Sequence, residues 1–324
     1  MRFLTVRCGL GVLALVALVG AVQAAPPRPS TFSIAAADAE AGEVGVAVAS
    51  RFFAVGAVVP WARAGVGAVA TQANGNVTFG PRGLDLLAQG LTPEETVKLL
   101  LRADTGSNAR QVGIVSATGD SATYSGSDCN PWAGGRKGPG YAVQGNILTG
   151  EKVVVAMEAA FLGSKGKPLA ERLYAALKAG DEAGGDSRGK QSAAVLVCRA
   201  KAGWNGFTDR AVDIRVDDSP EPLVEIGRLL GMALVNDVWN QGWTAFAEKR
   251  FPEALARQER AAARAEAQPG MLPEVLYDLA VIRLANADRP GALTADRRAI
   301  KLNPKLATQA RHDTDMAALR GELP

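Results

Sequence analysis

Alternating apolar and polar positions predict two short strands shortly after the N-terminal segment. In residues 31–38, Phe32 and Ile34 alternate with polar neighbours, and in residues 43–50 three valines alternate with small residues. Alternation with period two is typical of a half-buried strand, and the glycine-containing segment between the two runs is typical of a turn. The pattern therefore predicts a β-hairpin, followed by a third strand over residues 65–72.

The following part of the chain switches between helical and strand patterns in blocks. Helical spacing of apolar residues predicts helices over residues 81–89, 93–103, 151–162, 169–179 and 222–234. Strand patterns predict strands over residues 111–117, 122–125, 141–148, 191–199 and 211–216. This order is not the regular strand–helix alternation of a parallel sheet. We expect an α+β domain over residues 31–234, in which two mostly antiparallel sheets pack on each other between outer layers of helices.

From residue 235 to residue 324 the pattern is helical throughout and contains a repeat. The alanine pair Ala254 and Ala261 recurs as Ala292 and Ala299, seven residues apart each time and 38 residues further on. Small residues at this spacing let paired helices approach closely, as in tetratricopeptide (TPR) units of about 34 residues. We expect a TPR-like helical domain with residues 306–320 as a capping helix. An arbitrary helical hairpin is the alternative interpretation.

The N-terminal segment has the pattern of an export signal. Arg2 and Arg7 precede an apolar run, residues 8–20, and small residues follow up to Ala24. We therefore expect a signal peptide over residues 1–24, a proline-rich spacer over residues 25–30, and a periplasmic or secreted protein. The alternative is a membrane anchor, but the run is shorter than the ~20 apolar residues that a span needs. No membrane span is expected after cleavage.

Charge and composition exclude several function classes. The 324 residues contain 36 Lys and Arg against 33 Asp and Glu, a net charge of +3 that is too small for a nucleic-acid footprint. The single histidine, His312, lies near the C-terminus. Zinc hydrolase chemistry, a Ser-His-Asp triad and a Cys-His dyad all need imidazole among their active groups. We therefore expect no metal and no cofactor, and an enzyme, if this is one, that works without histidine.

Two cysteines remain after removal of the signal segment, Cys129 and Cys198. An exported protein meets an oxidising compartment, so a disulfide between them is one expectation. The alternative is that both are buried thiols that act as small apolar residues. The second interpretation is favoured because Cys198 follows an uninterrupted apolar strand pattern.

Polar residues at strand ends and in glycine-rich loops are the candidates for a binding site. They are Ser50, Gln72, Asn74, Gln144, Asn146, Asp186, Arg188 and Gln191. Amides can hold an oxyanion, and an Arg-Asp pair can orient a polar ligand. The alternative is ordinary turn chemistry, in which such side chains bond their own backbone. Convergence of these residues on one cleft would favour a pocket for a small polar molecule or a peptide.

Several blocks of the chain, in order, are similar to a bacterial family known as domain of unknown function 1028. They are residues 31–34, 43–50, 53–61, 64–72, 80–84 and 185–193. The resemblance spans nearly all of the first domain. It implies the four-layer αββα architecture of the N-terminal-nucleophile (Ntn) hydrolases, and it brings no established reaction. Members of the family are often followed by an additional C-terminal module.

If the likeness to Ntn hydrolases extends to mechanism, Thr31 is the nucleophile and its own α-amine is the base. That pair needs no histidine, because an α-amine titrates near pH ~8. In this role Asn74, Gln144 or Asn146 would supply oxyanion donors. This chain departs from the family, because residues 25–30 precede Thr31 after signal cleavage, so a second cut at Ser30–Thr31 is required. The alternative is that Thr31 is an ordinary β-branched residue opening a strand.

Two functions of different classes follow from the sequence. The first is an exported Ntn-type amide hydrolase with Thr31 as nucleophile and with Asp186 and Arg188 orienting the substrate. The second is a binding or scaffold protein, in which the first domain holds a small polar ligand or peptide. In that case the groove of the TPR-like repeats recruits a protein partner.

Overall fold

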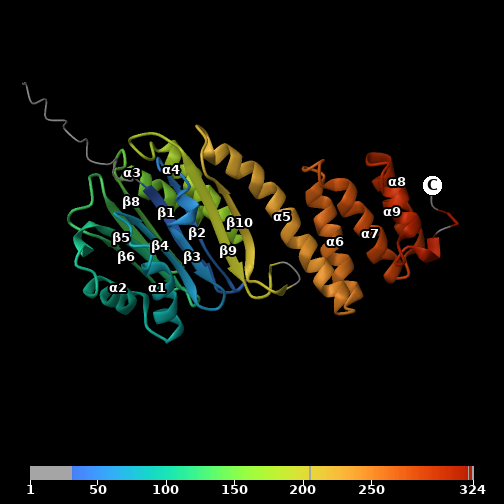
Figure 1. Cartoon of the computed structure of the whole chain (residues 1–324), viewed down its shortest axis with the longest axis horizontal. Helices are drawn as coiled ribbons and strands as arrows, with labels where there is room; N and C mark the ends of the chain where they lie inside the picture. Colours follow the sequence, from blue (N-terminus) through green and yellow to red (C-terminus); the bar gives the residue numbers. More distant parts are fainter. Residues whose placement is uncertain (1–30, 204–205, 320, 323–324) are drawn as a thin grey trace, which may run out of the picture.

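The computed structural model describes residues 31–203, 206–319 and 321–322. The expected signal peptide and the proline-rich spacer lie outside the described residues. Two antiparallel sheets pack face to face at one end of the molecule, and a set of helices extends away from them (Figure 1). Within the described part of the chain, every helix is too short or too polar to cross a membrane.

The larger sheet is built around the predicted hairpin. Its strands, in spatial order, are β10 (Arg210–Val216), β9 (Ser192–Arg199), β2 (Glu43–Ser50), β1 (Thr31–Asp38), β8 (Tyr141–Asn146) and β7 (Gly134–Gly138). β1 and β2 have the bounds that the alternation predicted. In the register, Thr31 faces Ser50 on one side and Asn146 on the other. Three candidate site residues thus lie at the end of the sheet where β1 begins.

The smaller sheet has four strands in the order β3 (Pro60–Arg63), β4 (Gly67–Ala73), β5 (Arg110–Ser116) and β6 (Ser121–Ser125). The sequence pattern did not predict β3 or β7. Both are edge strands, and β7 consists of three glycines and two basic residues, so neither shows apolar alternation. Pairing with a neighbouring strand, rather than side-chain burial, fixes their conformation.

Three apolar cores separate four layers of structure. Alanines and valines of both sheets, Ala35, Val46 and Ala68 among them, fill the space between the sheets. The outer face of the larger sheet packs on α3 (Lys152–Gly163), α4 (Leu169–Glu182) and the first half of α5 (Pro222–Ala247). The outer face of the smaller sheet packs on α1 (Phe79–Ala88) and α2 (Pro93–Arg102). The chain is therefore a mixed α+β protein with helices on the outer face of each antiparallel sheet.

The sequence pattern predicted that this helix ends at residue 234, but α5 does not end there. It continues to Ala247 and leads from the sheets to the helical region (Figure 1). Leu223, Ile226 and Leu230 belong to the core of the larger sheet, whereas Val235 and Val238 belong to the core of the helical region. The change of core therefore falls at the expected domain boundary, but no helix-breaking residue stands there to interrupt the helix.

The helical region consists of the second half of α5 with α6 (Phe251–Ala265), α7 (Leu272–Ala285), α8 (Arg289–Leu302) and α9 (Leu306–His312). All four repeat alanines are fully buried between these helices. The expected capping helix over residues 306–320 is wrong in extent, because α9 stops before Asp313 and a short 3₁₀ turn follows at residues 317–319.

A buried carboxylate joins two helices of this region. Asp278 of α7 accepts hydrogen bonds through Oδ2 from the indole nitrogens of Trp239 and Trp243 of α5, at 2.7 and 2.6 Å. Burial raises the pKa of Asp278 to about 6, although the two indole donors act in the opposite direction.

Candidate functional site

A buried polar network lies between the two sheets at the end where β1 begins. The Ser33 hydroxyl donates to Oε1 of Gln72 at 2.6 Å, and Gln72 Nε2 donates to Oε1 of Gln111 at 2.8 Å. The same Gln111 oxygen accepts from Asn146 Nδ2 at 2.9 Å, and Gln144 Nε2 donates to the Ser33 hydroxyl at 2.6 Å. At most 2% of each of these residues is exposed. The network joins the sheets through side chains of β1, β4, β5 and β8.

The side-chain amides of this network form hydrogen bonds with one another and with backbone carbonyl groups. Gln111 Nε2 donates to the carbonyl oxygen of Gly145 and to the Ser125 hydroxyl, each at 2.7 Å. Gln144 and Asn146 lie inside the network and are not among the residues that line the cavity beside Thr31, so the structure does not place them as donors to an oxyanion bound there. Their arrangement is that of a satisfied buried network, which fixes how the sheets pack.

Beside this network the first residue of β1 lines a cavity of about 210 Å³. The lining contains the apolar residues Phe52, Val55 and Val59 and the polar residues Thr31, Thr71, Gln72 and Asn74. The Thr31 hydroxyl is 3.2 Å from that of Ser50. Thr31, Ser50, Gln72 and Asn74 therefore lie close together at this end of the sheets, whereas Gln144 and Asp186 do not line the cavity. The volume of this cavity is below ~300 Å³, the lower end of the range for sites that bind drug-sized organic molecules.

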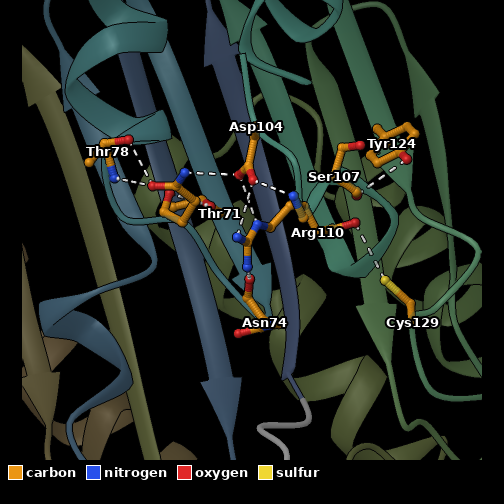
Figure 2. A network of polar contacts seen from close by, with 10 residues as sticks. Thr71, Asn74, Thr78, Asp104, Ser107, Arg110, Tyr124 and Cys129 are labelled. Atoms are coloured by element: carbon orange, nitrogen blue, oxygen red, sulfur yellow. Dashed lines mark hydrogen bonds and ion pairs between the residues drawn. The ribbon is translucent and has the colours of Figure 1, made fainter. Parts of the chain in front are cut away.

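The loop between β4 and α1 forms one wall of the cavity, and an ion pair behind it holds the loop in place (Figure 2). Arg110 donates to both carboxylate oxygens of Asp104, at 2.9 and 3.2 Å, and also to the carbonyl oxygen of Asn74. Asp104 also accepts from Asn76 Nδ2 at 2.9 Å, and the Thr71 hydroxyl donates to the Asn76 carbonyl oxygen at 3.1 Å. The guanidinium of Arg110 holds the pKa of Asp104 well below its usual range. The carboxylate thus stays charged and the loop stays ordered.

Asp186 and Arg188 tie together two loops next to the cavity rather than lining it. Asp186 accepts from the backbone nitrogen of Arg51 at 2.7 Å and from Arg188 Nη2 at 3.0 Å, while Arg188 also donates to the Arg51 carbonyl oxygen at 3.1 Å. The backbone nitrogen of Gln191 donates to the Ser50 carbonyl oxygen at 3.1 Å, and its side chain donates to Asp218. These residues position the end of β2, so their contribution to the cavity is indirect.

The central member of the network, Gln111, is not among the residues predicted from the sequence. Gln111 bonds to Gln72 and Asn146 and is fully buried, and Ser33 and Thr71 were likewise not selected. The signal for Gln111 was present, because an amide that opens an apolar strand needs partners once it is buried.

Cys129 and Cys198 are both free thiols in the structure; Cys198 is buried, as the favoured interpretation expected, whereas Cys129 is only half-buried. Cys129 Sγ donates to the Arg110 carbonyl oxygen at 3.4 Å, and Cys198 Sγ donates to the Ala62 carbonyl oxygen at 3.6 Å. Burial raises the pKa of the Cys129 thiol and raises that of Cys198 to about 12. Neither is an activated nucleophile. Among the described residues, no cluster of His, Cys, Asp and Glu side chains could hold a metal ion.

Comparison with known proteins supports the family resemblance. No curated protein matches. A crystal structure of a Silicibacter pomeroyi protein, SPO2555, described by the family model DUF1028, matches with a TM-score of 0.58 and 30% sequence identity, over 63% of this chain and 86% of that one. The model of the same family, described as a family of unknown function, matches residues 31–226. The chain therefore belongs to the DUF1028 family.

Proposed function

We propose that residues 31–234 form an Ntn-hydrolase-like domain that hydrolyses a small amide, with Thr31 as the nucleophile. The observation that carries the proposal is the position of the Thr31 hydroxyl, which opens β1 and lines a small cavity. The stacking of two antiparallel sheets between helices is the second support. Because residues 25–30 precede Thr31 in the sequence, the proposal requires cleavage of the Ser30–Thr31 bond.

The proposed reaction uses groups that meet at this cavity. Thr31 Oγ1 attacks the amide carbonyl carbon, and the α-amine of Thr31 takes the hydroxyl proton and passes it to the leaving amine. Asn74, which lines the cavity, is the proposed donor to the oxyanion. Water then hydrolyses the acyl-threonine ester and restores the hydroxyl. The apolar walls formed by Phe52, Val55 and Val59 favour a short apolar acyl group.

N-terminal sequencing of active protein tests this mechanism directly. A mature terminus at Thr31, with loss of amide hydrolysis in Thr31→Ala and partial retention in Thr31→Ser, is the expected result. Thr71→Ala is the matched control, because Thr71 is a second threonine of the cavity lining. A terminus at Ala25 in protein that hydrolyses amides would exclude the α-amine as base.

The second candidate function is a binding or scaffold role for the helical region, which we propose to be TPR-like. The observation that favours it is the complete burial of Ala254, Ala261, Ala292 and Ala299 at the helix contacts. A peptide or protein partner would then bind the groove of the repeats. Truncation after Glu248, which leaves α5 intact, should abolish capture of a partner from envelope extracts. An unchanged set of captured proteins would contradict this role.

We also propose export to the periplasm or the exterior, on the basis of the N-terminal sequence pattern alone. Cell fractionation with and without residues 1–24 tests it, and retention of both forms in the cytoplasm would contradict it.

A further inference from the structure

A second cavity, of about 360 Å³, lies where the sheets meet the helical region. One wall comes from the larger sheet, through Glu43 and Arg199, and the other comes from α5 and α6. Arg257, Arg260 and Arg264 of α6 all line it. Residues three and seven positions apart share one face of a helix, so the three guanidinium groups are presented together.

The two carboxylates that line this cavity, those of Glu43 and Asp237, form ion pairs with Arg199 of the larger sheet. Arg199 pairs with Glu43 at 2.5 Å and with Asp237 at 2.6 Å. Both partners raise the pKa of Arg199, although burial opposes them. Asp237 also accepts a hydrogen bond from Gln241 at 2.9 Å. The two acidic residues of the lining are therefore paired with Arg199 and not with the α6 arginines.

The α6 arginines have weak partners or none. Arg257 lies 3.8 Å from Glu253, and Arg264 lies 3.5 Å from Glu171, both longer than a close charge-assisted hydrogen bond. No residue that the structure describes forms a hydrogen bond or an ion pair with the Arg260 side chain. The lining contains four arginines against two carboxylates, so the cavity carries an excess of positive charge.

We propose that this cavity binds a small anion with two or more phosphate groups. Guanidinium groups recognise phosphate through paired N–H donors, and an anion with adjacent phosphates offers several acceptors to neighbouring arginines. The volume of the cavity lies in the range of small-molecule sites. A ligand held there contacts α6 and the end of the larger sheet at once, so it fastens the helical region to the sheets. This inference is independent of the activity proposed for Thr31.

Titration of the full-length protein with inorganic pyrophosphate, followed by calorimetry and thermal unfolding, tests the proposal. The expected result is saturable binding that raises the unfolding temperature and weakens with salt. Arg260→Gln and Arg257→Gln should each weaken binding about tenfold, since each removes charge-assisted bonds to the anion. Glutamine retains a high helix propensity, so α6 should stay folded.

Arg82→Gln is the matched control, because Arg82 is an exposed arginine of α1 that does not line the cavity. It should change the pyrophosphate affinity less than twofold. An equal loss in this variant would show general attraction to a basic surface and would overturn the proposal. Orthophosphate and citrate are the comparison ligands. Tighter binding of citrate than of pyrophosphate, or no pyrophosphate binding at millimolar concentration in low salt, would also overturn it.

Discussion

Gln111 is the residue whose replacement tests the polar network most sharply. Its side chain accepts from Gln72 and Asn146 and donates to the carbonyl oxygen of Gly145, all at 2.7–2.9 Å. Gln111→Leu keeps most of the side-chain volume, so it removes the hydrogen bonds without opening a large void. Three buried polar groups would each lose a partner.

Leaving a buried polar group without its partner costs about 1–3 kcal/mol. Residual bonds, such as that of Gln72 to the Thr31 carbonyl oxygen at 3.3 Å, recover part of this cost. We therefore expect Gln111→Leu to lower the free energy of unfolding by about 3–5 kcal/mol, a large share of the ~5–15 kcal/mol that is typical of a folded protein.

Urea unfolding followed by tryptophan fluorescence and circular dichroism measures this change. Gln191→Leu is the control, because Gln191 is only half-buried and its side chain bonds to Asp218 at the surface. It should change stability by less than about 0.5 kcal/mol. A loss below about 1 kcal/mol in Gln111→Leu would refute the reasoning, since it would mean that the amides between the sheets are readily satisfied without Gln111.

Three further predictions concern other parts of the chain. The pKa of Asp278 is raised to about 6 in the folded state, so the native state binds this proton more tightly than the unfolded chain does. The free energy of unfolding should therefore rise as the pH falls from about 6 to 4. Asp278→Asn should remove this pH-dependent component, which urea titrations at several pH values measure. Thr92→Ala should destabilise α2 by about 1 kcal/mol, because Thr92 and Glu95 cap its first turn reciprocally, and a control change at exposed Lys98 should have no such effect in thermal unfolding. Cys198 should resist a thiol reagent at pH 8 until the protein is unfolded, and rapid modification in the native state would contradict its burial.

The sequence pattern predicted the bounds of β1 and β2, but its alternation indicated half-buried strands, whereas side chains on both faces of these two strands are buried. It could not predict β3 and β7, whose pairing is imposed by neighbouring strands. Nor could it predict the length of α5, because the chain continues from one apolar core to another without a residue that ends a helix.

The candidate site was predicted in part, and the limit has a physical cause. Thr31, Ser50 and Gln72 are polar residues at or near strand ends, and in the structure Thr31 lies within hydrogen-bonding distance of the other two. Whether an amide faces a cavity or another amide depends on the register of the opposite sheet, which a single chain pattern does not contain. For that reason Gln144 and Asn146 were assigned to the pocket although they belong to the network behind it.

Because α5 is continuous, it connects the two cores as a single rigid helix. The first half of α5 packs against α4, β9 and β10, and the second half carries the two indoles that donate hydrogen bonds to Asp278. A shift of the larger sheet would therefore be transmitted as a swing of the whole helical region, enlarged with distance along the helix. The two halves of the protein cannot reorient independently unless the helix bends.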